Sequence, residues 1–292
     1  MIFNGFFAIM ISVKNSKGCS IAQRVNDMDN NYRNWGDMNS NTNAQNGMQN
    51  DYQNSYNNNG NGTFSNGISG VFSEVTEALQ QKVVAQSFLF MVVALAITAV
   101  GAKVASNVLL EWMINNPAGL ILLVVGEIVV VIVSNIALKA NNVVLSASLL
   151  TVYSFINGAT IGIVCMAYAE ASVTKVFVIT AVTFAITAAY GLIAKKDLSS
   201  VGSLCLMGLI GLIVMGIVNI FLQSSAVDYL ASFIGVAVFV GLTAYDTQKI
   251  KEKVAYADSS NVTSLSLNGA FQLYLDFINL FLYLLRIFGK RR

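Results

Sequence analysis

The sequence predicts an all-α integral membrane protein with seven transmembrane helices, the last of them central in the bundle. Hydrophobic residues make up 55% of the chain and charged residues 11%, whereas a soluble domain carries about 25% charged residues. From Lys82 onward, apolar blocks alternate with short polar breaks. Each block is close to the roughly 20 residues that a helix needs to cross a bilayer. The predicted spans are residues 83–105, 118–138, 143–167, 173–194, 201–223, 229–248 and 266–288.

The N-terminal region has a different composition from the rest of the chain. Residues 20–70 are rich in Asn, Gln, Gly, Ser and Tyr. Such a segment has too little apolar surface to offset the conformational entropy lost on folding. We therefore predict a disordered Asn-rich tail over residues 1–72 and a membrane domain over residues 73–292.

The distribution of basic residues predicts the topology. With a cytoplasmic N-terminus, the loops on the inner side contain Lys139, Lys195, Lys196, Lys249, Lys251 and Lys253. This bias follows the positive-inside rule and predicts a multi-pass protein of the cell (plasma) membrane. Lys290, Arg291 and Arg292 are the exception, because a full seventh crossing places them outside. Either these charges are tolerated there, or the last segment re-enters and returns.

The seventh block carries a polar stripe. Its polar residues recur at spacings of four and three, which places them on one helical face. In a membrane such a face must turn toward protein or water. We therefore expect the last helix to be wrapped by the other six, with its stripe lining a cavity and part of it forming an ion pathway. The stripe consists of Asn268, Gln272, Asp276, Asn279, Tyr283 and Arg286.

Two aspartates in apolar surroundings, Asp246 and Asp276, are the strongest functional signal. A carboxylate in hydrocarbon costs roughly 2.5–3.5 kcal/mol, so it rarely lacks a partner or a role. The loop over residues 250–265 is long enough for helices six and seven to run antiparallel. The two carboxyl groups then come within hydrogen-bond reach and share a proton. The alternative is that each aspartate separately caps a helix or bonds to a backbone group.

A third acid, Glu127, lies near the middle of the predicted second span. Its immediate neighbours are apolar, which makes ionisation costly unless the side chain faces a polar interior. One interpretation is a structural carboxyl that bonds to a neighbouring helix. The other places Glu127 on the ion pathway above the two aspartates.

Other classes of protein are poorly supported. The sequence contains no histidine and only three cysteines, without a CxxC pair, so zinc and disulfide chemistry are not expected. We find no nucleophile–base pair and no phosphate-binding loop, and we predict neither an enzyme nor a resident cofactor. The net charge of +2 is spread over short loops and the end of the chain and does not indicate nucleic-acid binding. Any pH sensing must use carboxylates.

Two long motifs resemble those of a known family. Residues 241–250 read Gly-Leu-Thr-Ala-Tyr-Asp-Thr-Gln-Lys-Ile, and residues 273–289 read Leu-Tyr-Leu-Asp-Phe-Ile-Asn-Leu-Phe-Leu-Tyr-Leu-Leu-Arg-Ile-Phe-Gly. With them, residues from about 80 to 292 resemble the bacterial branch of the Bax-inhibitor family, the transmembrane BAX inhibitor motif proteins. The resemblance implies seven helices and a pH-sensitive calcium leak controlled by an aspartate pair, here Asp246 and Asp276. In the family a basic residue of the second span latches the closed pair; that span has no arginine here, and Lys139 at its inner end is the candidate substitute.

Two functions compete at this stage. In a passive Ca²⁺ leak, carboxylates, Asn279 and backbone carbonyls supply the oxygen ligands that calcium prefers, and the aspartate pair binds the ion transiently. The partners are then calcium ions, protons and membrane lipids. The alternative is a non-transporting protein that modulates a membrane protease or a stress response, a cytoprotective role that an exposed tail would suit. A proton-coupled transporter is less favoured, because no internal repeat is visible.

Overall fold

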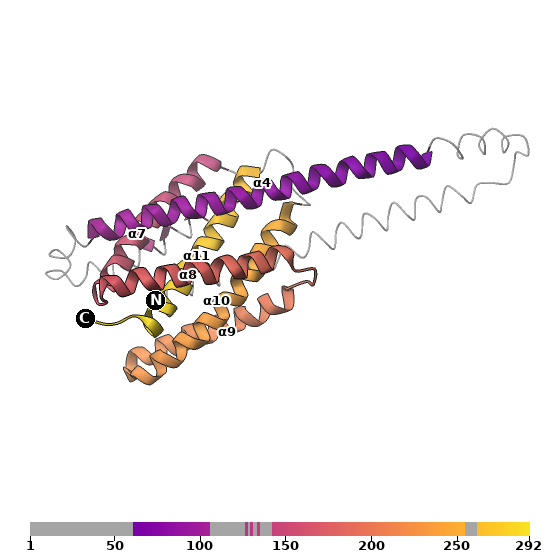
Figure 1. Cartoon of the computed structure of the whole chain (residues 1–292). Coiled ribbons are helices and arrows are strands. Elements are labelled where there is room, and N and C mark those ends of the chain that lie inside the picture. The colour runs from indigo at the N-terminus through magenta and orange to yellow at the C-terminus, as the bar shows by residue number, and fades with distance from the viewer. Residues whose placement is uncertain (1–60, 106–125, 128, 131–132, 135–141, 255–261) are drawn as a thin grey trace, which may run out of the picture. The chain divides into compact units, whose positions relative to one another are not determined.

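The computed structural model describes residues 61–105, 126–127, 129–130, 133–134, 142–254 and 262–292. The described elements of the chain are long helices, and six of them are long and apolar enough to cross a membrane. Figure 1 shows their arrangement. Their bounds are α4 Asn61–Val104, α7 Val143–Met166, α8 Glu170–Ile193, α9 Ser199–Leu222, α10 Ser225–Lys253 and α11 Val262–Phe288.

These helices coincide with six of the seven predicted spans. The predicted second span, residues 118–138, lies largely outside the described residues, and its described pieces are helical. The helix α4 begins at Asn61, inside the segment 1–72 predicted to be a disordered tail. Its apolar part begins at Thr76. Residues 1–60 lie outside the described residues, so the tail over them stays a prediction.

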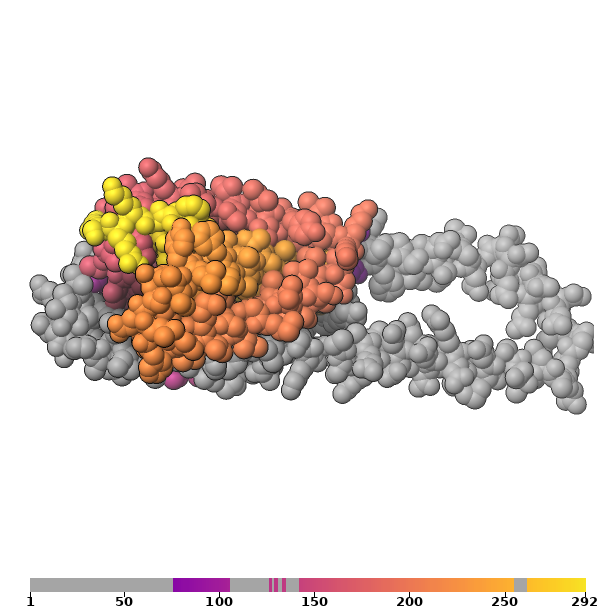
Figure 2. All heavy atoms as spheres, turned by 90° about the horizontal axis from the view of Figure 1, so that it is seen from below, coloured from indigo at the N-terminus to yellow at the C-terminus, as the bar shows by residue number. Residues whose placement is uncertain are grey.

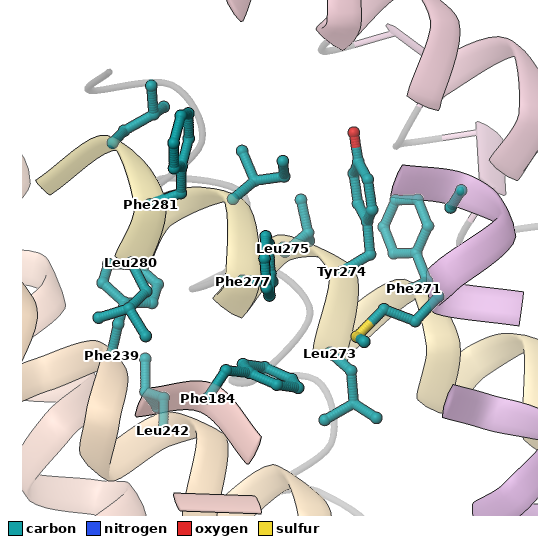
Figure 3. Close-up of a cluster of buried hydrophobic side chains, with 14 of the residues drawn as sticks. Phe184, Phe239, Leu242, Phe271, Leu273, Tyr274, Leu275, Phe277, Leu280 and Phe281 are labelled. Atoms are coloured by element: carbon teal, nitrogen blue, oxygen red, sulfur yellow. The ribbon is translucent and has the colours of Figure 1, made fainter. Parts of the chain in front are cut away.

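Among the described helices the last is the most buried, as the polar stripe predicted. In its apolar window 83% of the residues are buried, against 22–44% in the other five helices. Leu273, Tyr274 and Leu280 are fully buried. Figure 3 shows the side chains of α11 reaching toward neighbouring helices, with Leu280 near Phe239 of α10. The core of the bundle therefore forms around α11.

The surrounding helices present apolar side chains outward. Phe221 is 83% exposed and Ile193 is 77% exposed, and α9 carries a row of similar residues. In Figure 2 the orange atoms of α9 and α10 form much of the visible face. In water such a surface would be costly, whereas lipid tails solvate it without penalty. The exposed apolar surface is thus the membrane-facing side of the protein.

Glycines allow two groups of helices to pack closely. In the α4–α7 pair, Gly158 lies directly against the backbone of Thr98, and a Cβ atom on Gly162 would be 2.8 Å from the Cα atom of Ala102. Between α9 and α10, a Cβ atom on Gly202 would meet the ring of Tyr245 at 2.6 Å. Small residues at such positions let helix backbones approach in lipid.

The helices α10 and α11 run antiparallel along their length. Near the start of α10 and the end of α11, the Arg286 guanidinium donates to the Asp228 carboxylate at 2.9 Å. Near the other end, Gly269 of α11 lies against the side chain of Ile250. At about 1.5 Å per residue, the 27 residues of α11 extend for about 40 Å. The last segment is therefore one continuous helix beside α10, without the break that a re-entrant segment would need.

The residues after α11 are bound to the turn between α7 and α8. The Ala169 N–H donates to the Lys290 carbonyl at 2.9 Å, and the Arg292 N–H donates to the Ala167 carbonyl at 3.1 Å. Figure 2 shows these last residues, in yellow, at one end of the bundle. The three terminal basic residues consequently lie at the end opposite to Lys251 and Lys253.

Candidate functional site

The structure brings Asp246 of α10 and Asp276 of α11 together. Their carboxyl groups lie within interaction range of each other, and the two residues are only 9% and 2% exposed. Two carboxyl groups in contact inside a protein cannot both be ionised without a large repulsive cost, so such a pair holds a proton between them. The interpretation in which each aspartate acts separately does not agree with this geometry.

The surroundings of the pair leave polar groups without partners. The Asp276 Oδ2 atom and the Oε1 atom of Gln272, one turn earlier on α11, are buried and make no hydrogen bond within the described residues. Lys253, two turns after Asp246 on α10, is close enough to interact with it electrostatically. The thiol of Cys205 on α9 lies within electrostatic range of both aspartates. The site thus has two buried oxygen atoms without hydrogen-bond donors and one nearby basic side chain, that of Lys253.

Three members of the polar stripe of α11 meet partners on α10, whereas the predicted cavity along the stripe stays a prediction. Asp276 contacts Asp246, Arg286 contacts Asp228, and the Tyr283 ring stacks on that of Phe239 with centroids 5.8 Å apart. The helix α10 thus supplies a partner to three members of the stripe, while the Oε1 atom of Gln272 is left without one among the described residues.

The remaining amides of the stripe have different environments. Asn279 is 2% exposed and donates to the Leu275 carbonyl of its own helix at 2.7 Å. Gln272 is 4% exposed, and Asn268 is half-buried nearer the start of α11. The three predicted ion-pathway residues of this helix therefore lie along one face, on both sides of Asp276, in tightly packed surroundings.

Glu127 lies beside α7. It is 4% exposed, and its carboxylate accepts a hydrogen bond from the Thr160 hydroxyl at 2.7 Å. Its carboxyl group lies within electrostatic range of the hydroxyl groups of Tyr153 and Tyr274. The structure thus supplies the hydrogen bond that the structural interpretation requires. Lys139, the candidate latch, lies outside the described residues.

The opposite face of α11 is built from hydroxyl groups and aromatic rings. The hydroxyl oxygens of Tyr274 and of Thr98 on α4 are 2.7 Å apart and hydrogen-bonded. The rings of Tyr274 and of Tyr153 on α7 meet edge to face, with centroids 5.9 Å apart. Tyr153 also accepts a hydrogen bond from Asn157 at 2.9 Å. This side of α11 is therefore fastened to α4 and α7 by neutral contacts.

Gln248 is a residue to which the sequence analysis assigned no role. Its carbonyl oxygen accepts from the Leu198 N–H at 2.8 Å, and its amide group donates to the Lys196 carbonyl at 3.0 Å and to the Ala194 carbonyl at 3.3 Å. It thereby ties the connection between α8 and α9 to α10, two residues after Asp246. The sequence feature that could have indicated this role is the position of Gln248 in the 241–250 motif, two residues after Asp246.

These features define a class: an all-α membrane protein whose most buried helix carries a carboxyl pair shared with its antiparallel neighbour. Residues 80–292 match the family model described as inhibitor of apoptosis-promoting Bax1. The chain therefore belongs to the Bax-inhibitor family, as the two motifs predicted.

The relatives are bacterial. The chain is 41% identical over 217 residues to the inner membrane protein YbhL of Escherichia coli K12, which covers 73% of this chain and 93% of that protein. It is 36% identical over 218 residues to a protein of Borreliella burgdorferi, covering 73% of this chain and 94% of the relative. An uncharacterized membrane protein of Streptococcus pyogenes is 32% identical over 182 residues. This alignment covers 62% of this chain and 79% of the streptococcal protein. The match thus covers the helical domain.

Proposed function

We propose that this protein is a pH-sensitive calcium leak channel, gated by the Asp246–Asp276 pair. The observation that carries the proposal is the close approach of these two buried carboxyl groups in the interior of the bundle. Buried ionisable residues in membrane helices are expensive, and they mark ion pathways and proton relays more often than structural positions. The membrane is the cell (plasma) membrane, in keeping with the inner membrane relative of Escherichia coli, and the N-terminus is cytoplasmic.

The proposed gate works through one shared proton. At neutral pH one carboxyl donates to the other, ionised one, and this charge-assisted bond holds α10 against α11. At lower pH both carboxyl groups are protonated, and a neutral hydrogen bond of roughly half the strength replaces it. The two helices then separate more easily at this level of the bundle, and the channel opens.

The polar face of α11 would supply the ion's route. Calcium takes six to eight oxygen ligands, more than two carboxyl groups can offer. The unpartnered oxygen atoms of Asp276 and Gln272 are the first candidates to complete the shell. Asn279, Asn268, backbone carbonyls and water would supply the remaining ligands as the ion passes. Binding at the aspartate pair is therefore transient.

The proposal is tested by Ca²⁺ flux into proteoliposomes across a pH series. We expect the flux of the native protein to rise on acidification, and Asp246→Asn and Asp276→Asn each to flatten this response. The double variant should resemble the single variants, because the two residues titrate as one unit. Asp228→Asn is the matched control: it removes a carboxylate from the same helix pair, at the other end, and should keep the pH response.

Two outcomes would contradict the gate. One is a native pH profile in either single variant; the other is a double variant whose effect is the sum of the two single effects. A purified, folded protein without any Ca²⁺ flux would favour the non-transporting protein that modulates a membrane protease or stress response.

A further inference from the structure

A polar pocket of about 230 Å³ opens between the ends of α8 and α10. Its wall includes Lys195 and Lys251, together with Gln80 of α4 and Gln248 of α10. None of the proposed gate residues lines it. We propose that this pocket binds the phosphate group of an anionic phospholipid of the surrounding membrane.

The charges of the pocket favour an anion. Two acids contribute to its wall, Asp197 and Glu252, and both have partners within the protein. Glu252 is paired with Lys249 at 2.8 Å. Asp197 accepts from the Ser199 hydroxyl at 2.6 Å and from its backbone N–H at 2.8 Å, and these bonds hold the pKa of Asp197 below its usual value. Asp197 therefore stays ionised, and with Lys195, Lys251 and the Lys249–Glu252 pair the three positive and two negative groups leave a net charge of +1.

Lys195 and Lys251, by contrast, form no ion pair within the described residues. Both are exposed, and neither has an acidic partner among the described residues. Lys251 makes a single long contact, from its Nζ atom to the Leu192 carbonyl at 3.4 Å. Ammonium groups of this kind attract phosphate, because they are strong donors without a competing acceptor.

The position of the pocket selects a lipid as the source of the phosphate. It adjoins the end of α8, where Tyr190 is 60% exposed and Ile193 is 77% exposed. These side chains face the hydrocarbon, so an acyl chain can lie along them while the headgroup enters the pocket. Basic pockets between transmembrane helices bind lipid headgroups in this way. A volume of 230 Å³ is below the range of about 300–1,000 Å³ for pockets of drug-sized ligands, and it suits a headgroup.

Gln248 links the pocket to the rest of α10. Its side chain lines the pocket and also holds the connection between α8 and α9. A bound phosphate would therefore bridge Lys195 of that connection to Lys251 of α10, across the same junction. Lipid occupancy should add to the stability of the α8–α9–α10 group.

The test measures lipid retained by the full chain, purified from mixed vesicles of phosphatidylglycerol and phosphatidylcholine, by native mass spectrometry. We expect the native protein to retain phosphatidylglycerol preferentially. The double variant Lys195→Gln/Lys251→Gln should weaken this retention by about 5-fold for each lysine, the usual contribution of one basic side chain at an anionic surface. The control Lys290→Gln/Arg291→Gln removes the same charge at the other end and should keep it.

Three results would overturn the proposal. The first is equal retention of both lipids by the native protein, and the second is an equal loss in the two double variants, which would indicate a diffuse electrostatic effect. The third comes from inorganic phosphate in detergent: if it raises the melting temperature of the native protein and phosphatidylglycerol does not, the pocket serves a free anion. Monodisperse elution of both variants verifies their folding.

Discussion

The two sides of α11 differ in the kind of contact that holds them. Toward α10, the contacts involve ionisable groups, namely the Asp246–Asp276 pair and the Arg286–Asp228 ion pair. Toward α4, they are neutral, with the Tyr274 hydroxyl bonded to Thr98 and its ring against α7. Under the proposed gate, the Asp246–Asp276 pair makes the attraction on the α10 side depend on pH, whereas the neutral contacts on the α4 side do not.

The difference indicates which helices would move. Protonation changes the strength of the contact between α10 and α11, whereas hydroxyl bonds and aromatic packing stay the same across the physiological pH range. Close backbone packing at Gly158 and Gly162 holds α4 against α7 in addition. We therefore expect α4, α7 and α11 to stay together and the α10 side of α11 to open.

The largest expected effect comes from breaking the neutral side. In Gly158→Leu the new side chain would collide with the backbone of Thr98, which cannot yield as a flexible side chain would. We expect a loss of more than about 3 kcal/mol of stability, at the upper end of overpacking effects. Thermal unfolding in detergent measures it. Gly211→Leu is the control, since within the described part of the chain no atom beyond its own helix backbone and chain neighbours lies within 4 Å of its Cβ position, and it should fold normally. Equal stability of the two variants would refute the close packing of α4 on α7.

An intermediate effect is expected from Glu127→Gln. The amide keeps the shape of the side chain and can still accept from Thr160, so the protein should fold normally. If Glu127 lies on the ion pathway, loss of its charge lowers Ca²⁺ flux in proteoliposomes several-fold, because a carboxylate attracts the ion more strongly than an amide does. Unchanged flux would leave Glu127 with a structural role and restrict the pathway to the α10 side.

The smallest effect is expected from Tyr274→Phe. The Thr98 hydroxyl keeps its bond to the Ala94 carbonyl at 2.9 Å, so no buried donor is orphaned, and the loss should be about 1 kcal/mol. The pH response of Ca²⁺ flux should be unchanged. A shifted pH response in this variant would show that both sides of α11 take part in gating. Tyr229→Phe, at an exposed tyrosine on α10, controls for the loss of a hydroxyl.

Local patterns were sufficient for much of the fold. Apolar blocks of membrane-spanning length predicted the helices, because the length is set by the bilayer and can be counted along the chain. The four-and-three spacing in the last block predicted a buried helix, since a polar face in lipid must turn inward. The length of the loop between Asp246 and Asp276 allowed their pairing but left open that each acts separately.

Other features depended on distances between residues far apart in the chain. Nothing in the local sequence indicates that Gln248 bonds to the connection before Leu198, that Tyr274 meets Thr98, or that Glu127 lies beside Thr160. These contacts arise from the rotation and depth at which each helix packs, and those depend on side-chain shapes along the whole interface. For the same reason the sequence did not indicate that Tyr283 of the α11 stripe stacks on Phe239 of α10. The sequence was thus enough to establish which residues had to be inside the bundle, and the packing of the helices decided which of them touch.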